Sequence, residues 1–245
     1  MNSTVYRFIL ASKKKGKKLF AVLVDPDKFS SRVIRESHKA RADFIFVGGS
    51  KLQKGNFQRC VAAIRKLTPI PLVIFPGRLP EQISGKADAI LLPSLLSGRN
   101  PEYLIGQHVL AARHLKRSGV EIIPMGYILI GGGKKISTQI VTHTTPIKSA
   151  DTPLAVSTAI AGELLGMKII YLEAGSGSGT PLRASMIKEI RKNVSLPVIA
   201  GGGIDSAEKA IALCRSGADL IVVGNAIEKD STLAVRIANA IHSLT

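Results

Sequence analysis

Eight short apolar runs, each followed by a more polar stretch, are the feature that most constrains the fold of this 245-residue chain. The runs lie at 19–27, 43–50, 71–77, 89–98, 121–133, 168–179, 197–204 and 220–227. Most are continuously apolar rather than alternating, which is typical of strands covered on both faces of a parallel sheet. Helical patterns separate most of them, so the sequence predicts a series of β–α units.

Eight β–α units in about this length are the number expected for a (β/α)8 barrel. We therefore predict an α/β fold with a single TIM-type barrel domain over residues 1–245, because no linker or low-complexity segment divides the chain. The stretch after the third run, PGRLPEQISGKAD, has two prolines, two glycines and little periodicity, so the third helix is expected to be missing or short. An open doubly wound sheet is the alternative, but no GxGxxG motif follows the first run.

The cellular setting is predicted from what the sequence lacks. No run of 18 or more apolar residues is present, so no transmembrane helix is expected. At the N-terminus the charges follow the short apolar piece, the reverse of a secretory signal, which indicates a cytoplasmic protein. Cys60 and Cys214 have no metal-type spacing and are expected to be reduced thiols.

The formal net charge of +17 points to an anionic partner. Aromatic residues are only 4% of the chain, and the basic run Lys13–Lys18 contains no aromatic side chain that could stack on a base. We therefore expect no nucleic-acid partner. A phosphate-rich substrate and peripheral contact with an anionic membrane fit the charge better.

Small residues dominate the ends of the predicted strands, where barrels of this type place their functional groups. Glycine loops follow the last three runs, as AGSGSG after Glu173, as Gly201–Gly203, and as Gly224 before Asn225. Glycines let backbone N–H groups approach an anion closely, and a short helix after Asn225 would direct its N-terminus at the same point. Together these loops predict a phosphate-binding site.

Two acids stand among these small residues. Glu173 ends the sixth run and is predicted to be a general base beside the phosphate site, with an ion-paired or capping carboxylate as the alternative. Asp25, in VDPD at the end of the first run, is predicted to hold Mg²⁺ together with the Ser50 hydroxyl. An Asx-type cap on the following helix is the alternative for Asp25.

The motifs VDPDK, VGGS, YLEAGSGSG, IAGGGI and VVGNAIE occur in the order and spacing of one family. The sequence resembles the geranylgeranylglyceryl phosphate synthases and their bacterial heptaprenyl-transferring relatives over essentially its whole length. The resemblance implies a Mg²⁺-dependent prenyltransferase of phospholipid biosynthesis. It would join a long prenyl diphosphate, by default geranylgeranyl, to the 3-hydroxyl of sn-glycerol 1-phosphate and form an ether-lipid precursor.

The resemblance also implies roles for individual residues. The substrate-binding set would be Tyr171, Leu172, Glu173, Ala174, Gly175, Ser176, Gly177, Gly202, Gly203, Gly224 and Asn225. Asp25 and Ser50 would bind the metal, and Glu173 would take the proton of the attacking hydroxyl. Leu23 occupies a position where one branch of the family has a phosphate-contacting lysine, so the sequence resembles the other branch. That branch contains dimers and hexamers, so a homo-oligomer is expected.

Other interpretations of the same residues exist. A sugar-phosphate isomerase barrel would also use glycine loops after the last two strands, but it usually places an acid or base at the fifth, and here that run ends in YILIGGG. A non-catalytic barrel that binds RNA or membrane is disfavoured by the two strand-end acids. The apolar stretches 91–96 and 125–130 would line a prenyl groove or belong to the core. The segment 134–152 would be a lid or an ordinary connection.

Overall fold

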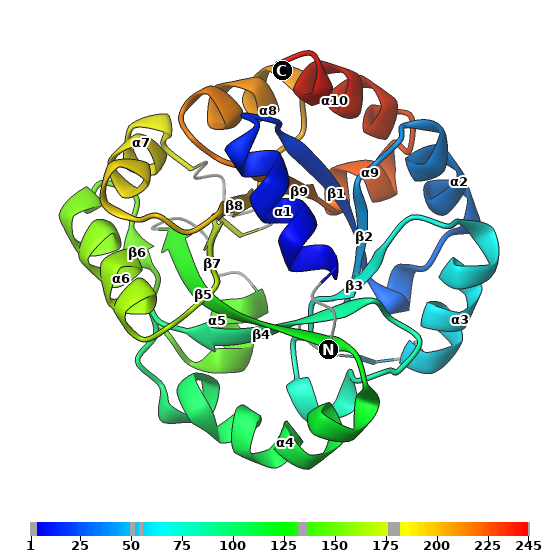
Figure 1. Ribbon diagram of the computed structural model, residues 1–245, viewed down its shortest axis with the longest axis horizontal. Coiled ribbons are helices and arrows are strands. Elements are labelled where there is room, and N and C mark those ends of the chain that lie inside the picture. Colours follow the sequence, from blue (N-terminus) through cyan, green and yellow to red (C-terminus); the bar gives the residue numbers. More distant parts are fainter. Residues whose placement is uncertain (1–3, 50–51, 54–55, 132–136, 176–181, 245) are drawn as a thin grey trace.

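The computed structural model is a closed barrel of eight parallel strands surrounded by helices (Figure 1), and it describes residues 4–49, 52–53, 56–131, 137–175 and 182–244. The barrel strands are β1 (Leu19–Val24), β2 (Phe44–Val47), β3 (Leu72–Ile74), β4 (Ala89–Leu95), β5 (Glu121–Gly131), β7 (Ile169–Glu173), β8 (Val198–Gly201) and β9 (Leu220–Val223). Neighbouring strands pair in parallel around the ring, which is complete because β1 pairs with β9 and β4 with β5. A two-residue strand, β6 (Ile147–Lys148), extends the end of β5. The predicted barrel is confirmed.

Helices form the outer layer of the barrel. The outer helices are α2 (Ser31–Lys39), α3 (Phe57–Leu67), α4 (Gln107–Ser118), α6 (Thr152–Leu164), α7 (Ala184–Asn193), α8 (Ala207–Arg215) and α10 (Leu233–His242). Two shorter helices, α5 (Ser137–Thr142) and α9 (Asn225–Lys229), follow the carboxyl ends of β5 and β9. Between β3 and β4 the chain makes only a 3-10 turn, Leu79–Glu81, so the third helix is absent as predicted.

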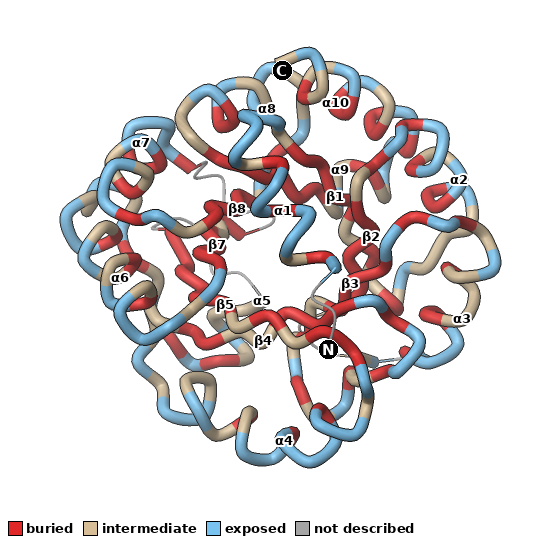
Figure 2. The backbone as a smooth tube through the Cα atoms, viewed as in Figure 1, coloured by how far each residue is buried: buried red, intermediate tan, exposed pale blue. Residues whose placement is uncertain are grey.

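Two apolar layers hold these elements together, one inside the barrel and one between the barrel and the helices. Figure 2 shows buried residues along the strands and on the inner sides of the helices. Successive side chains of a strand point to opposite faces, so each strand contributes to both layers. In β7, for example, Tyr171 lies in the inner layer and Leu172 in the outer one. Burial on both faces explains why the strand sequences are continuously apolar.

The helix α1 (Thr4–Lys14) closes one end of the barrel, a feature that the sequence patterns did not predict. It crosses the amino-terminal ends of the strands in the foreground of Figure 1 and adds Val5 and Ile9 to the inner layer. Both oxygens of the Glu121 carboxylate accept hydrogen bonds from its first turn, Oε2 from Val5 N at 2.8 Å and Oε1 from Tyr6 N at 3.0 Å. Glu121 therefore caps a helix that precedes it by more than 100 residues.

Three aspartates fix the register of neighbouring strands at the same end. Each follows an alanine, directly precedes a strand, and accepts the N–H of a residue in the strand beside it. Asp43, Asp88 and Asp219 accept from Phe20, Leu72 and Val198, at 2.8, 2.7 and 2.9 Å respectively. These N–H groups lie at the amino-terminal ends of their strands, and an unpaired buried donor there would be costly. The bonds would be lost if a strand slipped by one residue.

None of the described helices is long and apolar enough to cross a bilayer. Cys60 and Cys214 are buried free thiols on α3 and α8, and burial raises the pKa of each to about 12. Deprotonation is therefore suppressed at neutral pH, which makes both thiols unreactive.

The Glu121→Ala variant should lower the free energy of unfolding by about 2 kcal/mol, because it leaves two N–H groups of α1 without their acceptor. Urea denaturation measures this change. Glu36→Ala, which removes only an i,i+3 surface pair with Lys39, is the control and should cost less than about 0.5 kcal/mol. Equal losses in the two variants would contradict the capping role of Glu121.

Candidate active site

A cavity of about 820 Å³ opens at the carboxyl ends of the barrel strands, opposite α1. Its apolar wall includes three aromatic rings, those of Phe75, which directly follows β3, Tyr127 of β5 and Tyr171 of β7. The ring centroids lie 5.0 to 5.8 Å apart, so the three rings form one contiguous aromatic surface. Sequence analysis assigned no role to Phe75 or Tyr127, because their side-chain direction depends on the strand register.

Most of the predicted site residues lie around this cavity. Those that line it are Asp25, Tyr171, Glu173, Gly175, Gly202, Gly203, Gly224 and Asn225. Leu172 and Ala174 instead belong to the outer apolar layer, and Ala174 N donates to Gly201 O, so their side chains point away from the cavity. Ser50, Ser176 and Gly177 lie outside the described residues.

Glu173 presents a half-buried carboxyl to the cavity at the last position of β7. Burial raises its pKa from the usual 4.5 to about 7, although the N–H of Gly175, which donates to Oε1 at 2.7 Å, and the Tyr171 hydroxyl oppose the shift. A carboxyl with this pKa is divided between its charged and neutral forms at neutral pH. That is the property a general base needs.

The Tyr171 hydroxyl is fully buried beside Glu173. Burial and the nearby Glu173 carboxylate raise its pKa well above the usual value, so it stays protonated. Among the described residues it has no hydrogen-bond partner of standard geometry. Because the hydroxyl is fully buried, it acts on the neighbouring Glu173 carboxyl rather than on a molecule in the cavity.

The glycines after β8 serve two different purposes. A Cβ atom at Gly201 would collide with the Tyr171 hydroxyl, and one at Gly202 with the Glu173 carboxyl. Gly203, with φ of +67°, has open space where a side chain would lie. Only the third glycine of GGG thus leaves room for a ligand directly, while the first two accommodate the polar side chains of β7. Two glycines of the predicted phosphate loop are therefore also needed to make room for Glu173, the predicted base, and for Tyr171.

Asp25 lines the cavity at the end of β1, close to Gly49 at the end of β2. Its Oδ1 accepts from Asp27 N at 2.9 Å and caps the 3-10 turn Pro26–Lys28, so the alternative role as a cap is real. The carboxylate still faces the cavity. Within the described ranges no three His, Cys, Asp or Glu side chains cluster as a metal site. A magnesium ion that takes most of its oxygens from a diphosphate and water needs only one or two from the protein, so Asp25 fits such an ion.

Three basic side chains that line the cavity each lie beside an acid. Lys28 bonds Glu228 at 3.0 Å, Lys209 pairs with Asp205 at 2.7 Å, and Arg236 lies 3.4 Å from Asp230. Lys209 and Arg236 were not predicted as site residues. The sequence signal that could have found Lys209 is its position in the first turn of the helix that follows GGG.

Parts of the predicted apolar groove and lid also reach the cavity. Pro93 and Leu95 of β4 and Tyr127 of β5 line it, whereas Leu91 and Met125 are plain inner core. Thr138, Val141 and Thr142 line it from α5. The hydroxyl of Tyr103, from the π-helical turn Glu102–Gly106, donates to Val141 O at 3.1 Å and ties α5 to the segment after β4.

Comparison with known proteins decides the family. A model of the PcrB family matches residues 12–242. The chain belongs to the PcrB family. Among PcrB relatives, the geranylgeranylglyceryl phosphate synthase of Chitinophaga pinensis is 47% identical over 247 residues, covering 99% of this chain and 98% of that protein. The enzyme of the same name from Spirosoma linguale is 44% identical over 233 residues, covering 94% and 93%.

A solved structure in the family supports the same conclusion. The (S)-3-O-geranylgeranylglyceryl phosphate synthase of Thermoplasma acidophilum, in complex with its substrate sn-glycerol-1-phosphate, matches with a TM-score of 0.91 at 33% identity. The match covers 98% of this chain and 99% of that one. The resemblance inferred from the motifs is therefore confirmed for this PcrB member. The roles of its individual site residues stay predictions.

The raised pKa of Glu173 predicts a pH-dependent stability. Between pH of about 4.5 and 7 the folded protein keeps the Glu173 proton while the unfolded chain releases it, so the free energy of unfolding falls as the pH rises. Glu173→Gln removes this group. From pH 5 to pH 8 the variant should gain about 1–2 kcal/mol relative to the parent in urea denaturation. A constant difference across this range would show that the Glu173 pKa is not raised.

Proposed function

We propose that this protein is a geranylgeranylglyceryl phosphate synthase, which transfers a prenyl group from its diphosphate to the 3-hydroxyl of sn-glycerol 1-phosphate. The carboxyl of Glu173 in an aromatic-walled cavity is the observation that carries the proposal. The names of the relatives and the glycerol phosphate bound to the Thermoplasma acidophilum enzyme support the same substrates. The product would be an ether-lipid precursor.

In the proposed reaction Glu173 takes the proton of the 3-hydroxyl. The hydroxyl oxygen forms a new bond to the first carbon of the prenyl chain as that carbon's bond to the diphosphate breaks, and the diphosphate leaves with its electron pair. A base with a pKa of about 7 is matched to proton transfer at neutral pH. The N–H of Gly175 and the Tyr171 hydroxyl would keep the carboxylate directed at the substrate.

The glycerol phosphate is proposed to bind among the glycine loops after β7, β8 and β9. Gly175, Gly203, Gly224 and Asn225 line the cavity in three consecutive β–α units. Lys209, at the rim beside the loop after β8, would add a positive charge. Leu23 lines the same cavity, so in this chain the backbone would hold the phosphate where another branch uses a lysine.

The diphosphate is proposed to bind with Mg²⁺ near Asp25, at the end of β1, with Ser50 as a second protein oxygen. When bound, the ion would neutralise the charge that develops on the leaving diphosphate. The cavity-facing oxygens of Asp25 are suited to this hard cation.

The prenyl chain would lie against the apolar part of the cavity, which includes Phe75, Leu95, Tyr103, Tyr127 and Val141. Burial of each CH₂ group stabilises the complex by about 0.8 kcal/mol. A twenty-carbon chain would therefore bind much more strongly than a ten-carbon chain.

We also propose a homo-oligomer and peripheral contact with an anionic membrane. Ile105, Val109 and Leu110 are more than half exposed on and before α4, and Leu164 and Leu165 are exposed at the end of α6. Apolar groups of this size on a surface are typical of protein–protein contacts. The membrane contact is supported by the excess of basic residues.

The assay that tests the function uses labelled sn-glycerol 1-phosphate, Mg²⁺ and prenyl diphosphates of ten to thirty-five carbons, and follows label that becomes soluble in organic solvent. We expect product that disappears on chelation of Mg²⁺. Glu173→Gln should lower kcat/KM about 100-fold or more, because the base is lost. The parent kcat/KM should rise with pH, with a midpoint near 7.

Asp205→Asn is the matched control for the loss of a cavity acid, since Asp205 lines the rim but pairs with Lys209. It should keep most of the activity. Absence of product with every chain length would refute the prenyltransferase, and full activity of Glu173→Gln would refute only the assignment of the base.

The oligomer has its own test. Val109→Glu should shift the protein to a smaller mass in light scattering after size exclusion, because it places a charge in the exposed apolar surface of α4. Arg59→Glu, the control, changes the charge at an exposed position of α3 and should leave the mass unchanged. If the parent is a monomer, the oligomer proposal fails.

A further inference from the structure

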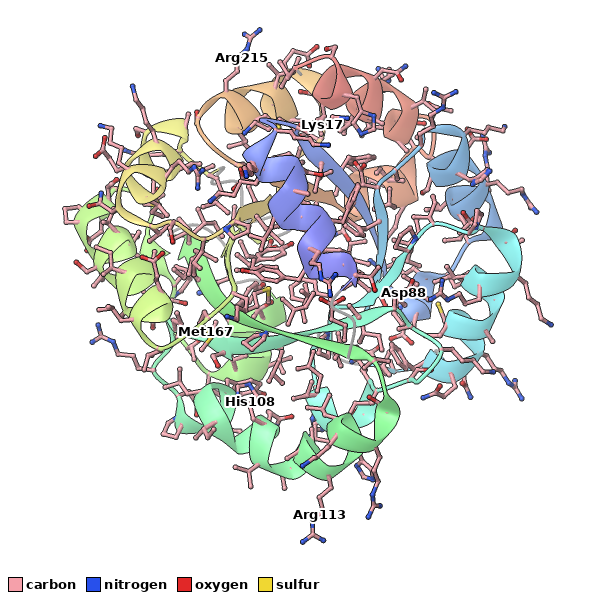
Figure 3. All side chains as sticks on the ribbon, in the orientation of Figure 1. Lys17, Asp88, His108, Arg113, Met167 and Arg215 are labelled. Atoms are coloured by element: carbon pink, nitrogen blue, oxygen red, sulfur yellow. The ribbon has the colours of Figure 1, made fainter. Side chains whose placement is uncertain are left out.

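The end of the barrel opposite the cavity carries a ring of exposed basic residues. Every one of the eight segments that lead into a barrel strand contributes at least one. The ring consists of Lys15 and Lys17 before β1, Lys39 and Arg41 before β2, Lys66 before β3, Lys86 before β4, Lys116 and Arg117 before β5, Lys168 before β7, Lys192 before β8, and Arg215 before β9. Figure 3 labels Lys17 beside α1 and Arg215 at the periphery of the same view.

Most acids at this end bond other groups rather than the ring cations. Asp43, Asp88 and Asp219 accept strand N–H groups, Glu121 caps α1, and Glu163 accepts from Ser195. Within the described parts of the chain, only Lys39 and Lys192 of the ring have an acidic partner within 4 Å, Glu36 and Glu189 respectively. The remaining nine ring cations have no carboxylate within 4 Å among the described residues.

Helix dipoles explain only part of the ring. Basic residues in the last turn of a helix stabilise it, which accounts for ring residues in five segments: Lys39, Lys66, Lys116 and Arg117, Lys192, and Arg215. Lys17, Arg41, Lys86 and Lys168 lie beyond the ends of helices and gain little from the dipole. Helix stability thus explains a basic residue in five of the eight segments. It does not explain the basic residues before β1, β4 and β7.

The helix α1 adds apolar groups at the centre of the ring. Leu10 is 38% exposed on the outer face of α1, one helical turn from the exposed residues Arg7 and Lys14 on the same face. Phe8 is 46% exposed at the side of the helix and packs edge-on against Phe44 of the inner layer. An apolar side chain flanked by cations on one helix face is typical of helices that lie in the interface of an anionic bilayer.

We propose that this end of the barrel, formed by the ring and α1, docks on a membrane surface rich in anionic phospholipid. Each basic residue near such a surface raises the partition coefficient about fivefold. Eight of the eleven ring residues are lysines, and Phe8 is the one largely exposed aromatic side chain among the described residues at this end, so the surface lacks the stacking platform of a nucleic-acid site. The proposal rests on the membrane contact proposed above and names the surface that makes it, but it does not depend on the prenyl-transfer reaction. Docking by this end leaves the cavity open to sn-glycerol 1-phosphate from solution.

Flotation of the full chain with vesicles tests this proposal. Vesicles of phosphatidylglycerol and phosphatidylcholine in equal parts should bind the protein at low salt, and vesicles of phosphatidylcholine alone should not. Binding should weaken as salt rises. The triple variant Lys17→Glu, Lys86→Glu, Lys168→Glu should lower the partition coefficient at least about tenfold, since it reverses charge at three separated points of the ring.

The matched control is Arg59→Glu, Arg113→Glu, Lys188→Glu, which makes the same change in net charge on exposed positions of α3, α4 and α7. It should bind nearly as the parent does. Circular dichroism and prenyl-transfer activity check that both triple variants fold. Equal loss in the two variants, or no vesicle binding by the parent, would overturn the proposal. So would displacement of the protein from vesicles by a short RNA duplex at physiological salt.

Discussion

Carboxylates at the amino-terminal end of the barrel hold the strands in register, and the geometry of the cavity depends on them. Asp43, Asp88 and Asp219 each bond the N–H of a neighbouring strand, and Glu121 bonds α1 across the barrel floor. A register error of one residue would exchange the inner and outer faces of a strand. Tyr171 and Glu173 face the cavity only because β7 is in register with β5 and β8.

The two ends of the barrel therefore have separate tasks. At the amino-terminal end, acids satisfy backbone donors and stabilise the fold. At the carboxyl end, Glu173 is a carboxyl in an apolar setting, and its raised pKa shows that the folded protein disfavours its charge. Such a group lowers stability at neutral pH, which is typical of residues kept for chemistry rather than for folding.

The strand pattern could be predicted from the sequence because burial on both faces of the sheet leaves a direct trace in continuous apolar runs. The missing third helix was predictable because proline and glycine interrupt residues 76–88. The helix α1 was not, because its N-terminal cap is supplied by Glu121, far along the chain. For the candidate site, Asp25, Glu173 and the glycine loops were identified as strand-end residues, whereas the aromatic wall and Lys209 depend on contacts between elements. The motif from Tyr171 to Gly177 was predicted to bind the substrate as a whole. Side chains alternate along a strand, however, so Leu172 and Ala174 point outward, away from the cavity.

The close packing of Gly201 and Gly202 against Tyr171 and Glu173 has an evolutionary consequence. No larger residue can arise at Gly201 while the tyrosine is retained, because only side-chain atoms of β7 fill the space there. At Gly202 a Cβ atom would meet the backbone nitrogens of Ala174 and Gly175 as well as the Glu173 carboxyl, and φ is +81°, so loss of the glutamate does not remove the constraint. Across related barrels Gly201 should therefore covary with Tyr171, whereas Gly202 should stay glycine even in a lineage that has changed its base.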